Sequence, residues 1–89
     1  MAALDLLGRR WTLRVLWELR DGPVGARTLR DRCDAMSPSV LYERLGELID
    51  AGLVMQSDDQ RYALTEIGSA LASALEPLDQ WSRQWARQG

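Results

Sequence analysis

Apolar residues recur at spacings of three and four along most of this 89-residue chain, and this spacing is the feature that most restricts its fold. Such a repeat places side chains on one face of an α-helix, whereas a half-buried strand alternates with a period of two. Near the N-terminus the repeat comprises Leu4, Leu7, Trp11, Val15 and Leu19. We expect a short helix before Gly8 and a longer one over about 11–20, which 21–23 (DGP) ends.

Two further helices are predicted in the middle of the chain. The first covers about 26–33, where Leu29 and Cys33 face inward. The second starts with Ser37 as N-cap and Pro38 at the first helical position, two residue types that favour a helix start. Its buried stripe is expected to contain Leu41, Leu45, Leu48 and Ile49.

The C-terminal part is predicted to form a small β-hairpin and a long helix. Strands at 53–56 and 61–64 are joined by 57–60 (SDDQ), which is typical of a tight turn. Thr65 is expected to cap the last helix, and Pro77 to interrupt its backbone hydrogen bonding. With the N-terminal segment counted as one element, the order helix-helix-helix-strand-strand-helix describes a mainly α, winged helix-turn-helix fold, with residues 1–89 as a single domain.

The composition argues against an enzyme. The chain has no His and one Cys, so the commonest general base and metal ligand is missing, and neither an internal disulfide nor a Cys-rich zinc site can form. We therefore expect no catalytic residue, no metal and no cofactor. The N-terminus does not resemble a signal peptide and no apolar run approaches about 18 residues, which predicts a cytoplasmic protein with no membrane partner.

The net charge of −2 argues at first against a nucleic-acid partner, because DNA-binding domains are usually basic. The charges are unevenly distributed, however. Residues 1–32 contain seven Arg and four acidic residues, whereas residues 33–89 contain four Arg and nine acidic residues. An Arg-rich face is therefore compatible with an acidic chain that contains no Lys.

Several separated motifs resemble, in the same order, those of the HxlR-type transcriptional regulators of the MarR-like superfamily. They lie at 4–13 (LDLLGRRWTL), 18–19, 21–23, 37–45 (SPSVLYERL), 47–48, 51–54 (AGLV) and 62–68 (YALTEIG). The resemblance implies a homodimeric, bacterial, winged-helix regulator that binds double-stranded DNA. It also implies that 37–45 belongs to the recognition helix and that the first and last helices build the dimer.

Candidate DNA-binding residues lie in the recognition helix, the helix before it and the wing. They are Arg27, Arg30, Ser37, Pro38, Ser39, Tyr42, Glu43, Arg44 and Arg61. A helix N-terminus suits a phosphate, and an Arg can clamp a phosphate or read a guanine. Three alternatives stay open: Arg44 pairs with Glu43 or Glu47 along the helix, Ser37 serves as a cap, and Tyr42 is buried against the wing.

The chain departs from the family in its charges. The positions of Ser39 and Gly46 are often Lys and Arg in the family, and both charges are absent here. Asp58 and Asp59 at the tip of the wing would repel phosphate, and Arg61 is the only cation of the wing. Since each lost phosphate contact lowers DNA affinity, we expect weak or strongly salt-sensitive binding.

A homodimer is predicted because the last helix carries an apolar stripe longer than one small core can cover. The expected dimer residues are Leu4, Leu7, Trp11, Leu71, Leu75, Leu78, Trp81 and Trp85. The Trp residues are interpreted as core and dimer packing, with an aromatic pocket for a small-molecule effector as the alternative. Cys33 is interpreted as a small buried hydrophobe rather than a redox sensor, because it has no His or Lys beside it.

The leading hypothesis is a sequence-specific transcriptional regulator that binds a palindromic operator as a homodimer. The alternative is a degenerate winged helix that acts as a protein-interaction or dimerisation module with weak or no DNA binding. The acidic wing and the missing Lys favour this alternative, whereas the order of the motifs favours the regulator.

Overall fold

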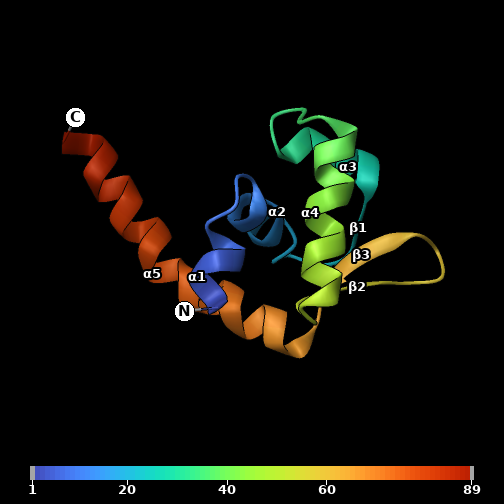
Figure 1. Ribbon diagram of the computed structural model, residues 1–89. Coiled ribbons are helices and arrows are strands. Elements are labelled where there is room, and N and C mark those ends of the chain that lie inside the picture. Colours follow the sequence, from blue (N-terminus) through green and yellow to red (C-terminus); the bar gives the residue numbers. More distant parts are fainter. Residues whose placement is uncertain (1, 89) are drawn as a thin grey trace.

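The structure, a computed structural model, describes the backbone of residues 2–88 and the side chains of residues 5–88 (Figure 1). Its elements are α1 (Ala2–Leu7), α2 (Thr12–Glu18), β1 (Val24–Gly25), α3 (Ala26–Arg32), α4 (Pro38–Asp50), β2 (Val54–Gln56), β3 (Arg61–Leu64) and α5 (Glu66–Gln88). Figure 1 shows α2, α3 and α4 grouped in one body, with the hairpin projecting on one side and α5 leaving toward the other. This arrangement confirms the predicted mainly α, winged helix-turn-helix fold.

The sheet has one strand more than the predicted hairpin. Its three strands are antiparallel in the order β1-β3-β2. In β1, Val24 pairs with Tyr62 and Gly25 pairs with Arg61. Two residues are too few to show an alternating pattern, so the sequence gives no sign of this strand. Because β1 leads directly into α3, it ties the start of α3 to the wing.

The core is built around the inner face of α4. Leu41, Leu45 and Leu48 are each at most 1% exposed and confirm the predicted stripe. They meet side chains of the other two body helices and the residues that follow them, namely Val15, Leu16, Leu19, Leu29 and Cys33. The prediction was wrong for Ile49, which is 38% exposed, because one residue after Leu48 lies about 100° further round the helix.

The junction between the wing and α5 is held by Thr65. Its hydroxyl donates a hydrogen bond to the carbonyl oxygen of Gly52 at 2.6 Å and accepts one from the backbone N–H of Gly68 at 3.1 Å. The second bond confirms the predicted helix cap. The backbone N–H of Thr65 also donates to the carbonyl oxygen of Leu53 at 3.0 Å. The end of α4 and the start of α5 are therefore held by the same few backbone groups.

Helix α5 is 23 residues long in total and is not broken at Pro77. In its first half, Ala72 is 5% exposed and Leu71 and Leu75 pack against the core. In its second half, Leu78, Trp81 and Trp85 are 52%, 55% and 67% exposed. This second half projects beyond the body of the molecule (Figure 1). One chain therefore leaves the C-terminal part of the predicted apolar stripe uncovered.

Two glycines in helices should respond in opposite ways to replacement by Ala. A Cβ at Gly68 would collide with the backbone carbonyl of Leu53, whereas a Cβ at Gly46 would meet nothing within 4 Å. We expect Gly68→Ala to lower the free energy of unfolding by about 1–3 kcal/mol through overpacking. We expect Gly46→Ala to raise it by about 0.5–1 kcal/mol, because Gly is a poor helix former. Urea unfolding followed by Trp fluorescence measures both. Equal stability of Gly68→Ala and the wild type would contradict the close approach.

Candidate nucleic-acid interface

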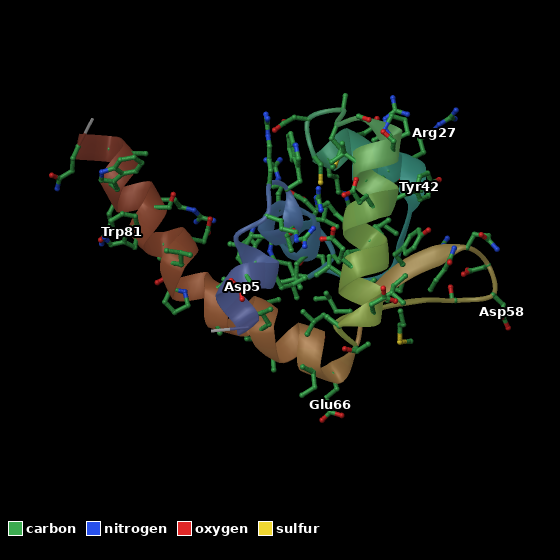
Figure 2. All side chains as sticks on the ribbon, in the orientation of Figure 1. Asp5, Arg27, Tyr42, Asp58, Glu66 and Trp81 are labelled. Carbon is green, nitrogen blue, oxygen red and sulfur yellow. The ribbon has the colours of Figure 1, made fainter. Side chains whose placement is uncertain are left out.

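The exposed face of α4 carries most of the predicted DNA-contact residues. Ser37, Pro38, Ser39, Tyr42 and Glu43 are all exposed at the N-terminal half of this helix. Tyr42 is 55% exposed, so the alternative in which it is buried against the wing is wrong. Figure 2 shows Tyr42 on α4, with Arg27 of α3 beyond the N-terminal end of the same helix. The fold thus leaves polar side chains uncovered where a winged helix presents its recognition helix.

Ser37 occupies the predicted N-cap position but does not cap through its side chain. Its hydroxyl shares a hydrogen bond of 2.9 Å with the hydroxyl of Ser39, and no hydrogen bond from it to the first turn of α4 is present. The carbonyl oxygen of Ser37 accepts from the N–H of Leu41 at 3.0 Å. The first amides of a helix lack partners within the helix itself. The N–H groups at the start of α4 are therefore left for an external acceptor such as phosphate.

The predicted cations of α3 and the wing differ in their surroundings. Arg27 is exposed, whereas Arg30 is half-buried and its Nε atom has no hydrogen-bond partner among the described residues. The Arg61 side chain is 60% exposed and lies 3.6 Å from a carboxylate oxygen of Asp59. Of these three cations, Arg27 is thus the one that is exposed and makes no ion pair with another described residue.

The tip of the wing is anionic. Asp58 lies at the tip of the hairpin (Figure 2), and Asp59 follows it. The hydroxyl of Ser57 donates a hydrogen bond to Asp59 and, with the nearby Arg61, lowers the pKa of this carboxyl. Asp59 therefore stays ionised at neutral pH and offsets much of the charge of Arg61. The structure supports the expected repulsion between this turn and phosphate.

Arg44 lies in an ion pair rather than on the exposed face of α4. Its Nη1 is 2.6 Å from Oε1 of Glu47, and its Nη2 is 3.4 Å from Oε1 of Glu43. The Arg44 side chain is 13% exposed. The alternative in which Arg44 pairs along the helix is thus confirmed, and a contact between Arg44 and DNA stays a prediction. Glu47, its closer partner, is half-buried beside it.

The predicted dimer residues fall into two groups. Leu7, Trp11, Leu71 and Leu75 are half-buried within one chain, whereas Leu78, Trp81 and Trp85 are exposed; the side chain of Leu4 lies outside the described residues. The rings of Trp81 and Trp85 stack, with centroids 5.9 Å apart and an interplanar angle of 6°. This second group is a continuous aromatic surface on the projecting part of α5.

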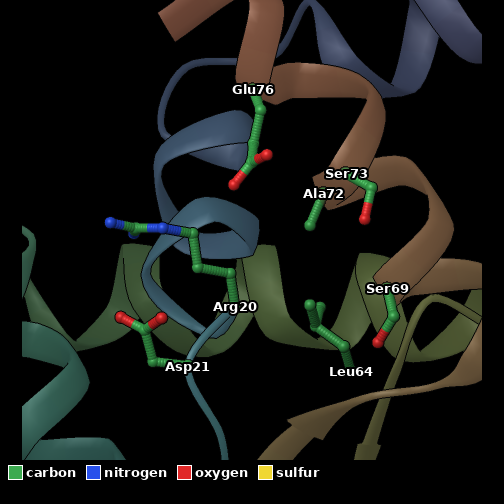
Figure 3. A pocket seen from close by; sticks show the side chains of 7 residues that line it. All are labelled: Arg20, Asp21, Leu64, Ser69, Ala72, Ser73 and Glu76. Carbon is green, nitrogen blue, oxygen red and sulfur yellow. The ribbon is translucent and has the colours of Figure 1, made fainter.

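Two hollows beside α5 are not made by predicted DNA-binding residues. A groove of about 280 Å³ runs between α2 and α5, where Leu13 and Trp17 face Leu75 and Leu78. A more polar pocket of about 190 Å³ lies between the end of α2, β3 and α5 (Figure 3). Its lining residues are Arg20, Asp21, Leu64, Ser69, Ala72, Ser73 and Glu76. They come from three separate segments, so no local sequence motif could have found this pocket.

Cys33 lies in the core and is fully buried. Burial raises the pKa of its thiol to about 11, and the nearby Arg14 only partly opposes this shift. The thiolate is the reactive form of cysteine, so the native side chain is inert at neutral pH. The interpretation of Cys33 as a buried hydrophobe is supported by this position.

The fold and the exposed α4 together define a winged helix-turn-helix of the kind that binds DNA. Among solved structures, quinone-bound YodB from Bacillus subtilis superposes with a TM-score of 0.83 and 32% identity, covering 93% of this chain and 92% of YodB. A possible HxlR family transcriptional factor from Thermoplasma volcanium superposes with a TM-score of 0.86 and 33% identity, covering 94% and 81%.

Residues 6–89 match the HxlR-like helix-turn-helix family, and this chain belongs to that family. The transcriptional regulator YodB of B. subtilis is 30% identical over 94 residues, which cover 99% of this chain and 84% of YodB. An uncharacterised HTH-type transcriptional regulator of Methanocaldococcus jannaschii is 28% identical over 89 residues, with 96% and 83% covered. The chain is accordingly a DNA-binding transcriptional regulator, and the prediction that it is not an enzyme is confirmed.

Two absences hold for the part of the chain that the structure describes. No group of three or more His, Cys, Asp and Glu side chains within it could hold a metal ion. No helix within it combines the length and the apolar character that crossing a membrane requires.

The buried position of Cys33 predicts slow reaction with thiol reagents. With a pKa of about 11, roughly one thiol in a thousand is ionised at pH 8, against about a quarter for an unperturbed thiol. We expect labelling by 5,5′-dithiobis(2-nitrobenzoic acid) to be at least about 100-fold slower in the native protein than in urea. Fast labelling of the native protein would contradict the burial. A Cys33→Ala variant, which should not react, provides the background rate.

Proposed function

We propose that this chain acts as a homodimer that binds a palindromic operator in double-stranded DNA, with the N-terminal half of α4 in the major groove. The observation that carries this proposal is the uncovered polar face of α4, on which Ser37, Ser39 and Tyr42 are all exposed beside unpaired first-turn amides. Such amides bind phosphate, while polar side chains one turn further along can reach base edges.

Phosphate contacts in this proposal come from few cations. Arg27 is exposed, Arg30 is half-buried, and Arg61 forms an ion pair with Asp59. The family positions that are often Lys and Arg hold Ser39 and Gly46 here. Non-specific attraction is therefore weak, and recognition depends more on the helix amides and base contacts than in a basic relative.

The homodimer is supported by the heptad-like spacing of α5. Apolar residues follow one another at alternating intervals of four and three residues, at Ile67, Leu71, Ala74, Leu78, Trp81 and Trp85. This spacing suits the seam between two helices that pack at a shallow angle. A second copy of α5 would cover the exposed Leu78, Trp81 and Trp85, and a two-fold axis there would present two copies of α4 to one palindrome.

Quinone-bound YodB is a relative, but we do not assign Cys33 to a quinone response. A covalent response needs an accessible thiolate, and this thiol is buried with a raised pKa.

DNA binding is tested by selecting bound duplexes from a random pool and measuring affinity at several salt concentrations. We expect an enriched palindrome, because two α4 helices in a two-fold dimer read two equal half-sites. We expect Arg27→Ala to weaken binding and to reduce the slope of log affinity against log salt by about 0.9, the value for one phosphate contact. Arg87→Ala, which removes the same charge from the far end of α5, should change neither quantity.

Failure to enrich any duplex, even at low salt, would overturn the proposal. It would favour the degenerate winged helix that acts through protein contacts, for which the acidic tip of the wing is the supporting observation. Enrichment of a sequence with no two-fold symmetry would reject the palindromic operator but not DNA binding.

The dimer is tested by charging its proposed seam. We expect Trp85→Glu to shift sedimentation equilibrium toward the monomer by at least about ten-fold in dissociation constant, because a buried unpaired charge costs well over 1.4 kcal/mol. Gln80→Glu adds the same charge at an exposed residue of α5 that faces away from the apolar stripe, and should leave the equilibrium unchanged. A Trp85→Glu variant that remains dimeric would place the interface elsewhere.

A further inference from the structure

A cluster of charged side chains joins α4 to the segment between α1 and α2. The Oε1 atom of Glu47 accepts hydrogen bonds from Nη1 of Arg44 at 2.6 Å and from Nη1 of Arg9 at 3.1 Å. One carboxylate oxygen thus bridges the recognition helix and a residue 38 positions earlier in the chain. Glu43 adds a longer contact to Arg44 at 3.4 Å.

The centre of this cluster is shielded from water. The Arg44 and Glu47 side chains are 13% and 21% exposed, whereas that of Arg9 is 56% exposed. Nε of Arg44 and Oε2 of Glu47 are buried, and neither has a hydrogen-bond partner among the described residues. Moving Arg44 out to a phosphate would remove a strong partner from Glu47, whose second oxygen already lacks one. Such a loss is costly for a largely buried charge.

The side of α4 that holds this cluster is not the side proposed to meet DNA. Ser39, Tyr42 and Gly46 are exposed, whereas Arg44 and Glu47 are half-buried one turn apart on the flank that reaches Arg9. Arg44 therefore occupies a place between the core and the DNA-facing surface.

We infer that Arg44 and Glu47 are positioning residues that fix the rotation of α4 about its own axis: Glu47 binds Arg9, and Arg44 holds the Glu47 carboxylate in place. In this inference, which rests on the proposed function, Arg44 affects DNA binding through the orientation of Ser39 and Tyr42 and does not touch phosphate or base.

The apolar packing of α4 decides which face of the helix is buried, and a directional contact fixes its remaining rotation more narrowly. The stripe of Leu41, Leu45 and Leu48 holds the helix against the core, but the hydrophobic effect that drives this burial is non-directional. The segment that presents Arg9 is itself held by the backbone. The N–H of Arg9 donates to the carbonyl oxygen of Leu6 at 3.4 Å, and the carbonyl oxygen of Arg9 accepts from the N–H of Thr12 at 3.2 Å. The cluster thus anchors one flank of α4 to a local turn.

The link is tested by comparing Arg9→Gln with Arg10→Gln. The two variants lose the same charge at adjacent exposed positions, but only Arg9 contacts Glu47. We expect Arg9→Gln to weaken binding to the selected duplex by about two- to five-fold, as for loss of one exposed ion pair. Its affinity for an unrelated duplex should match that of Arg10→Gln. A loss of mere stability would not change this ratio of specific to non-specific affinity, so the ratio identifies a positioning role.

The role of Arg44 is tested by the salt dependence of Arg44→Gln. We expect a loss of specific affinity of about five-fold or more, with the slope of log affinity against log salt unchanged. A fall in the slope of about 0.9 would instead indicate a direct phosphate contact and would overturn the inference. Arg27→Ala, measured in parallel, shows the slope change that a phosphate contact produces.

The contact itself is tested without DNA by a double-mutant cycle in urea unfolding. Arg9→Gln should lower the free energy of unfolding in the wild type but not in a Glu47→Gln background, because the partner is then absent. Additive effects, or equal specific affinities for Arg9→Gln and Arg10→Gln, would overturn the inference while leaving DNA binding intact. A wild-type protein that binds no duplex would instead overturn the proposed function, and this inference with it.

Discussion

The burial of one side of α4 is the constraint on which the rest of the molecule depends. Leu41, Leu45 and Leu48 are almost completely withdrawn from water, and each contributes roughly 1.5–3 kcal/mol relative to an exposed side chain. Once these three positions point inward, the period of the helix directs Ser39, Tyr42 and Gly46 outward. Helices α2 and α3 and the sheet are arranged around the same stripe. The surface proposed to bind DNA is thus the face of α4 that core packing leaves exposed.

Much of this fold follows from short-range rules. Three- and four-residue spacing locates the helices within about two residues, and Thr65 forms the cap that its position predicts. One error occurs where a partner distant in sequence decides the outcome, and another where two local partners compete. Strand β1 forms by pairing with the edge of β3, and no pattern within Val24–Gly25 predicts it. The hydroxyl of Ser37 bonds to the hydroxyl of Ser39 instead of accepting from a helix amide, a choice between two local partners that propensity does not resolve.

The candidate site was predictable in its position but not in its electrostatics. Sequence spacing places Ser39, Tyr42 and Glu43 on the open face of the helix, and they are there. It also allows Arg44 to pair with Glu43 or Glu47, but it cannot show that Arg9 completes the cluster, because 38 residues separate Arg9 from Glu47. Burial of the pair further depends on the packing of the whole body. The net charge of −2 is therefore a poor guide to DNA binding. The number of Arg side chains that are not already paired with carboxylates of the protein is a better one.

The exposed tryptophans of α5 have a consequence for how operator occupancy depends on the concentration of the chain. Leu78, Trp81 and Trp85 lie on a segment that one chain leaves uncovered, so in the proposed homodimer the pairing of chains and the occupation of the operator are linked equilibria. Well below the dimer dissociation constant, the concentration of the DNA-binding species grows with the square of the chain concentration. A two-fold change in synthesis then changes operator occupancy about four-fold, by mass action. The aromatic surface would in that way sharpen a genetic response with no small molecule involved.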